Sequence, residues 1–106
     1  MEYLFKKGKS KIIAPIRVTY VITEIAQEHP AKAMFIVPKR LFKKAKDRNK
    51  LKRRIKEAYR KNKFQLYEKL NGAGKKYLIG FSYTAKEISS YEEIEKSVLK
   101  LIEKII

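Results

Sequence analysis

The longest stretch of this sequence without glycine or proline places the strongest constraint on its fold. Within it, the segment from Leu41 to Leu70 is rich in residues that favour helices. Its apolar residues, with one asparagine, recur at the three- and four-residue spacings of a helix face. They are Leu51, Ile55, Ala58, Tyr59, Asn62, Leu66 and Leu70. We expect a helix with one side on a core, a break near Lys63 because of its length, and an end at Gly72.

Three segments with alternating apolar residues predict β-strands. They span Ile16 to Thr23, Ala33 to Val37 and Lys76 to Thr84, and residues 10–13 are a candidate edge strand. The short polar turn between the first two predicts that they pair as a hairpin. A last helix is expected to begin at Ser89 or Ser90. The order of elements predicts a single α+β domain over residues 1–106, folded as a two-layer α/β sandwich.

The net charge limits the kinds of partner that we expect for this protein. The 106 residues carry 27 Lys and Arg against 11 Asp and Glu, a formal charge of +16. Because such self-repulsion destabilises a compact state, we expect a polyanionic partner, with nucleic acid first and an anionic membrane surface second. The absence of cysteine excludes disulfides and cysteine-based zinc sites. No apolar stretch approaches the length of a membrane span, so we expect a cytoplasmic protein without a membrane partner.

Most of the charge lies in the helical segment. Residues 39–63 hold fourteen Lys and Arg against Asp47 and Glu57, a net +12. At 100° per residue, one row of side chains falls opposite the apolar face. This row comprises Lys46, Asn49, Arg53, Lys56 and Arg60. Like charges at these spacings repel each other, whereas a phosphate backbone would attract all of them. The alternatives are a solvated face, which usually mixes both signs, and a membrane-surface helix, which needs flanking bulky apolar residues.

The residues of this helix resemble a known signature. Arg48 to Tyr59 read RNKLKRRIKEAY, which resembles the R-N-R, K-R, R pattern of the bacterial ribonuclease P protein component. Phe5 to Ser10 resemble the family's F-x-x-G-x-S segment. Further similar segments are Val18-Thr19-Tyr20, Val37-Pro38-Lys39-Arg40 and Tyr91-Glu92-Glu93. The resemblance covers most of the chain from Phe5 onward, and it implies a split β-α-β fold, also found in ribosomal proteins, with a left-handed crossover. Sequence patterns alone favour the usual right-handed crossover.

The resemblance also implies a function and a set of contacts. The family's protein is the non-catalytic subunit of ribonuclease P, whose catalytic centre is RNA with bound divalent metal such as magnesium. It binds that RNA one-to-one as a monomer and assists removal of the 5′ leader from precursor tRNA. The implied RNA-binding set is Lys39, Arg40, Lys46, Arg48, Asn49, Lys50, Lys52, Arg53, Lys56 and Arg60. The implied leader cleft is lined by Phe5, Ser10, Val18 and Tyr20. Aromatic residues within a basic groove suit single-stranded nucleic acid.

The sequence departs from the family pattern in two respects. Lys50 and Lys56 stand where the family usually has arginine, so they keep the charge but lose the bidentate guanidinium. The family also has a basic N-terminal helix with a further aromatic before Phe5. Because this chain starts at Met1-Glu2-Tyr3, we expect a shortened N-terminus that lacks most of that helix.

No residues of this sequence suggest a catalytic centre of its own. His29 stands alone before Pro30, and there are no paired carboxylates, phosphate-binding loop or metal-ligand spacing. We therefore expect no cofactor in the protein and no nuclease activity without RNA. One rival is a small ribosomal or other structural RNA-binding protein of similar fold. A second is a duplex-DNA regulator, which needs base-reading residues at the start of a recognition helix. The largely Lys and Arg row suits backbone contact instead.

Overall fold

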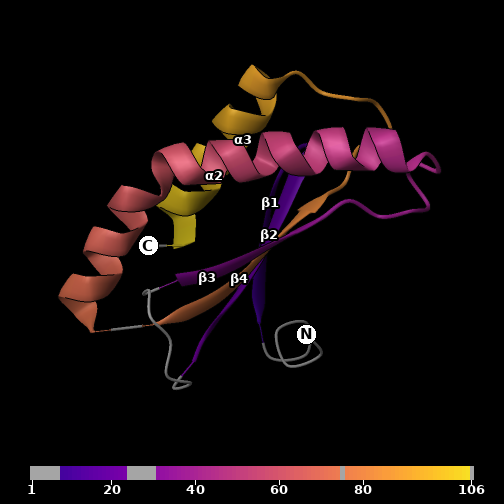
Figure 1. Ribbon diagram of the computed structural model, residues 1–106. Helices are drawn as coiled ribbons and strands as arrows, with labels where there is room; N and C mark the ends of the chain where they lie inside the picture. The colour runs from indigo at the N-terminus through magenta and orange to yellow at the C-terminus, as the bar shows by residue number, and fades with distance from the viewer. Residues whose placement is uncertain (1–7, 24–30, 75, 106) are drawn as a thin grey trace.

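The computed structural model describes residues 8–23, 31–74 and 76–105, which form a four-stranded sheet and two helices (Figure 1). The strands are β1 (Lys9–Ile13), β2 (Ile16–Ile22), β3 (Ala31–Ile36) and β4 (Tyr77–Tyr83). The helices are α2 (Ala45–Ala73) and α3 (Tyr91–Ile105). Phe5 and His29 lie outside the described residues. The α+β class, the edge strand and both helices are as the sequence predicts.

The strand order is β1-β2-β4-β3, so the expected hairpin between β2 and β3 is wrong. β2 pairs antiparallel with β1 on one side and with β4 on the other, where Val18 lies opposite Phe81. β3 pairs parallel with β4 at the far edge. The reason is burial, since β4 is apolar on its inner side and buried along most of its length. Such a strand is favoured at the centre of a sheet, where it separates β2 from β3.

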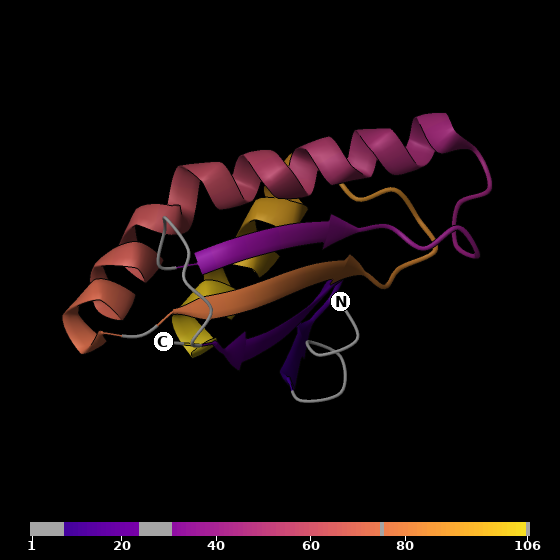
Figure 2. The ribbon, with the colours of Figure 1, turned by 60° about the horizontal axis from the view of Figure 1, so that its bottom comes forward.

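The connection from β3 through α2 to β4 crosses over in the left-handed sense, as the family resemblance implies (Figure 2). Both helices lie on the same face of the sheet, which makes a two-layer sandwich (Figure 2). α2 runs above β3, and α3 packs beside it over β1 and β2. The usual right-handed rule is therefore broken in this unit.

α2 is a single helix over Ala45–Ala73, without the expected interruption near Lys63, but its axis bends in its second half (Figure 1). It ends two residues later than expected, because Gly74 and not Gly72 takes the left-handed conformation, with φ of 66°. The N–H of Gly74 caps the helix on the carbonyl of Asn71. α3 begins as expected: Ser90 Oγ accepts a hydrogen bond from the Glu93 N–H at 3.3 Å, a capping arrangement.

The core lies between the sheet and the two helices. β4 contributes Tyr77, Ile79, Phe81 and Tyr83 from one face, as alternation predicts. The ring of Phe81 lies 5.9 Å from that of Phe35 and 5.5 Å from that of Tyr59, measured between centroids. These contacts fix α2 against β3 and β4 along one side. The opposite side of α2 is therefore left for another role.

Candidate nucleic-acid interface

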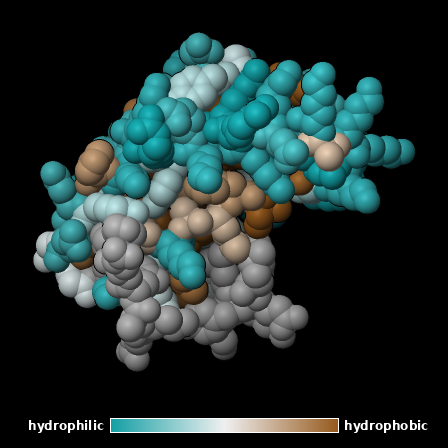
Figure 3. Space-filling view, viewed as in Figure 1, coloured by the Kyte–Doolittle hydropathy of each residue, from teal (hydrophilic) through white to brown (hydrophobic). Residues whose placement is uncertain are grey.

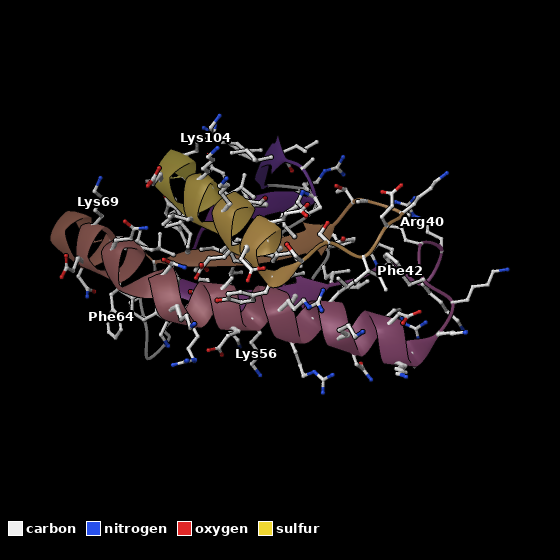
Figure 4. The ribbon with its side chains drawn as sticks, turned by 90° about the horizontal axis from the view of Figure 1, so that it is seen from above. Arg40, Phe42, Lys56, Phe64, Lys69 and Lys104 are labelled. Carbon is white, nitrogen blue, oxygen red and sulfur yellow. The ribbon has the colours of Figure 1, made fainter. Side chains whose placement is uncertain are left out.

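A basic turn leads into α2. Lys39 and Arg40 are exposed there, and the N–H of Leu41 closes the turn on the carbonyl of Pro38 at 3.1 Å. The turn is anchored by the buried ring of Phe42, which meets Tyr83 edge-on at 5.7 Å. Figure 4 shows Arg40 at this end of the molecule, beyond the start of α2. The two cations are thus held in place by a buried aromatic residue.

Arg48 folds back onto this turn. Its Nη1 donates to the carbonyl oxygens of Phe42 and Lys43, both at 2.8 Å. A guanidinium has five N–H donors, so Arg48 keeps donors for a phosphate, but one nitrogen fixes the turn. The structure therefore gives this predicted RNA-binding residue a local structural role as well.

Replacement of Arg48 by alanine is expected to lower the free energy of unfolding by about 1–3 kcal/mol, because two carbonyl groups lose their partner. The control is Arg40→Ala, which removes the same charge from an exposed position. Thermal unfolding of both variants in the absence of RNA measures the difference. Equal melting temperatures would mean that the two hydrogen bonds contribute nothing to the fold.

One exposed row of side chains follows α2 on the side away from the core. It contains the predicted residues Lys46, Asn49, Arg53, Lys56 and Arg60, and we call it the basic ridge. Lys52 is exposed beside it, whereas Lys50 is half-buried. Figure 4 shows Lys56 pointing outward from α2, and Figure 3 shows a hydrophilic surface along this helix. The structure thus bears out the exposure that the helical spacing predicts.

The charges of the basic ridge are only slightly compensated. Arg60 forms an ion pair with Glu57, with Nη2 to Oε1 at 2.5 Å, and this contact lowers the pKa of Glu57. Both side chains are exposed, so the pair is weak. Among the residues that the structure describes, no carboxylate lies within ion-pair distance of Arg53 or Lys56. These two cations are therefore available to an external anion.

A groove runs between the basic ridge and β3. It has a volume of about 450 Å³ and is lined by Phe35, Asn49, Lys52, Arg53 and Lys56. Figure 3 shows apolar surface beneath the hydrophilic side chains of the helix. An aromatic ring below a row of cations suits a nucleic-acid strand, since bases stack on the ring while the cations meet phosphates. Sequence reasoning missed Phe35, because its proximity to the helix depends on where β3 lies in the sheet.

A further arginine of the segment is used within the fold. Arg54 donates from Nη1 to the carbonyl oxygen of Ser89 at 2.6 Å, which joins α2 to the residues before α3. The RNA-binding set that the resemblance implies does not include it. Local charge density alone therefore overstates the number of cations that face a partner.

The described residues of the predicted leader cleft lie on two different faces of the sheet. Ser10 is exposed, and its hydroxyl hydrogen-bonds that of Thr19 at 3.0 Å, on the sheet face away from the helices. Val18 and Tyr20 alternate with Thr19 and lie on the face toward the helices. Val18 is completely buried, and Tyr20 is half-buried and stacked on Tyr77. The described members of the set therefore do not line one surface.

The described residues hold no candidate metal centre. No group of three His, Asp or Glu residues is close enough there to hold an ion. No helix in the described part of the chain is long and apolar enough to cross a membrane. The interface consists of cations, aromatic rings and an amide, and what it can do chemically is bind and position a polyanion.

A small basic α+β domain with a cationic helix face turned away from its core is characteristic of the nucleic-acid-binding class. Comparison with known proteins is more specific. The family model for Ribonuclease P matches residues 2–106. The Ribonuclease P protein component of Porphyromonas gingivalis strain ATCC 33277 is 31% identical over 105 residues, covering 96% of this chain and 74% of that protein. The chain belongs to the ribonuclease P protein family.

Solved structures support the fold. The RNase P protein from Thermotoga maritima, in complex with 1-(4-fluorophenyl)-2-thiourea, aligns with a TM-score of 0.76 at 24% identity. That alignment covers 99% of this chain and 92% of the other. The Staphylococcus aureus RNase P protein aligns with a TM-score of 0.69 at 27% identity, covering 98% and 85%. The split β-α-β sandwich is thus the architecture of the solved family members.

Proposed function

We propose that this chain is the protein subunit of the ribonuclease P ribonucleoprotein, and that it binds the catalytic RNA through the basic ridge. The observation that carries the proposal is the row of exposed cations on α2, of which Arg53 and Lys56 have no carboxylate partner among the described residues. A phosphate backbone would remove their mutual repulsion and release counterions. A single protein bound to one RNA is the simplest assembly.

The proposed division of labour leaves the chemistry to the RNA. Hydrolysis of a phosphodiester needs an activated water and stabilisation of the leaving oxygen, which magnesium ions bound by RNA would supply. The protein would contribute cations that reduce repulsion between catalytic RNA and precursor tRNA. This lowers the magnesium concentration at which the two RNAs associate.

The 5′ leader of precursor tRNA is the second proposed ligand. Of the described residues in the predicted cleft, only Ser10 is freely exposed. Its face of the sheet also carries the exposed Arg17, which is paired in register with Ile12. We therefore place the leader against this face, with Arg17 near a leader phosphate.

Reconstitution tests the proposed function. The protein is added to a bacterial ribonuclease P RNA, and leader removal from precursor tRNA is assayed at low magnesium. Activity should rise strongly with protein present, and rigorously RNA-free protein should show none. The same assay with ribosomal RNA fragments as competitors addresses the ribosomal alternative, because a ribosomal protein would prefer those fragments. Failure to stimulate the RNA would overturn the proposal.

Arg53→Ala is expected to reduce affinity for ribonuclease P RNA by about 1.5–3 kcal/mol, the range for a charge-assisted contact to phosphate. The matched control is Lys104→Ala, also an exposed cation on a helix, which Figure 4 places at the far end of α3 from the basic ridge. Both variants should fold normally, as circular dichroism would verify. Equal losses of affinity would indicate a diffuse electrostatic surface instead of a defined one.

A further inference from the structure

A second hollow continues the groove along α2. It has a volume of about 280 Å³ and shares Phe35 and Lys56 with the groove described above. Its remaining lining residues are Ala31, Ala33, Tyr59, Arg60, Lys63 and Tyr67. Ala31 and Ala33 belong to β3, whereas Arg60, Lys63 and Tyr67 lie on α2 beyond the family-like signature, which ends at Tyr59. We call this hollow the Tyr59–Tyr67 pocket.

The pocket exists because β3 carries small side chains where it faces the aromatic residues of α2. Ala31 and Ala33 present only methyl groups toward the helix, whereas the next residue on that face, Phe35, reaches the core. The hydroxyl of Tyr67 lies 3.4 Å from the carbonyl oxygen of Ala31 and closes one end. The walls are therefore aromatic rings and the floor is a strand with short side chains, which leaves a space for a flat group.

The polar groups of the pocket match a nucleotide. The Tyr59 hydroxyl is buried and interacts with the neighbouring Tyr67 side chain, but among the described residues no hydrogen bond of normal geometry satisfies it. Burial, with a smaller contribution from the neighbouring Tyr67 side chain, raises the pKa of Tyr59 above its ordinary value. Lys63 Nζ lies 5.6 Å from the ring centroid of Tyr67 at the rim. No carboxylate lines the pocket, while three cations do.

We propose that the Tyr59–Tyr67 pocket holds one unpaired base of an RNA strand whose phosphates lie on the basic ridge. The inference rests on the proposed function and adds to it a site for a single base. The ring would stack against the aromatic wall, and Lys56 and Lys63 would contact the flanking phosphates. The polar edge of the base would reach the buried Tyr59 hydroxyl when the Tyr67 side chain beside that hydroxyl moves aside. An acidic peptide would satisfy the cations but not the flat aromatic space, so RNA is the better match.

Two strands of eight nucleotides test the inference: oligouridine, and an abasic ribose-phosphate strand with the same number of phosphates. The wild-type protein should bind oligouridine about tenfold more tightly than the abasic strand. Ala33→Leu fills the pocket without changing charge, and should reduce that preference severalfold while leaving affinity for the abasic strand unchanged. Ala33→Ser is the matched control, because serine keeps the pocket open and should keep the preference.

Tyr59→Phe gives an independent measurement. It removes a hydroxyl that interacts with the Tyr67 side chain but makes no hydrogen bond of normal geometry in the described part of the fold, so most of the stability should be kept, and the preference for bases should fall a few-fold. A preference that survives both Ala33→Leu and Tyr59→Phe in folded protein would overturn the pocket as a base site. Binding of ribonuclease P RNA and stimulation of cleavage are measured on the same proteins. An unchanged base preference in the pocket variants, with wild-type stimulation intact, would reject the inference alone, whereas failure of wild-type stimulation would reject the proposed function.

Discussion

Raising the monovalent salt concentration from about 50 to 200 mM is expected to weaken binding to ribonuclease P RNA about a thousandfold. The basic ridge, Lys52 and the basic turn together offer enough exposed cations to neutralise roughly six phosphates, and each contributes about −0.7 to −0.9 to the slope of log K against log salt. Filter binding over a salt series measures the slope. A slope shallower than about −2 would mean that α2 is not the interface.

Single substitutions show which residues account for the salt dependence of binding. Lys52→Ala and Lys56→Ala should each make the slope shallower by about one, since each removes one phosphate contact. Lys104→Ala, on α3, should leave it unchanged. Arg60→Ala is expected to change the slope less than Lys56→Ala, because the Arg60 guanidinium already donates two hydrogen bonds to the Glu57 carboxylate.

Tyr20→Ala is expected to lower the free energy of unfolding by about 2–4 kcal/mol, the usual range for truncating a large side chain that packs on a core. Tyr20 is half-buried against the core cluster, and its ring stacks on that of Tyr77 with centroids 5.8 Å apart. Urea unfolding of the isolated protein measures the loss. Tyr20→Phe, which keeps the ring, should keep most of the stability.

The same variant locates the leader. At a temperature where Tyr20→Ala is folded, the reconstituted holoenzyme should keep its preference for precursor over mature tRNA. Arg17→Ala, on the opposite face of the sheet, should reduce that preference while leaving stability unchanged. Undiminished stability with lost preference in Tyr20→Ala would place the leader on the helix side of β2 and contradict the proposed position.

Local patterns were sufficient for most of the elements. Alternation identifies the buried side of β4, and the three- and four-residue spacing identifies both the core side of α2 and its exposed row. The pairing partners of β2 were not predictable in this way. The length of a turn limits the distance between two successive strands, but it does not determine whether they pair with each other. The end of α2 was placed at Gly72 because two glycines compete within three residues, and only the backbone angles distinguish Gly74.

The candidate interface was predictable to the extent that it depends on one helix. The exposed positions of Arg53 and Lys56 follow from the turn of α2 itself. The hydrogen bonds of Arg48 and Arg54 to carbonyl oxygens do not, because they involve segments that only the folded chain brings near. Phe35 and the alanines of β3 were missed for the same reason. The leader-cleft set combined Ser10 with Val18 and Tyr20, which strand alternation and the β1–β2 register place on opposite faces.

The continuity of α2 has a consequence for how RNA is selected. From Lys46 to Arg60 the helix rises by about 21 Å, and the Phe42 turn and the buried Leu51, Ile55 and Ala58 hold this part of it to the core. Because this part of α2 is held rigidly, the spacing between its cations is fixed, and the cations cannot shift independently to fit an RNA strand. An RNA whose phosphates follow the same spacing engages all of them at once, whereas one of different curvature loses contact at one end. Discrimination between RNAs by backbone shape is then possible without any base being read.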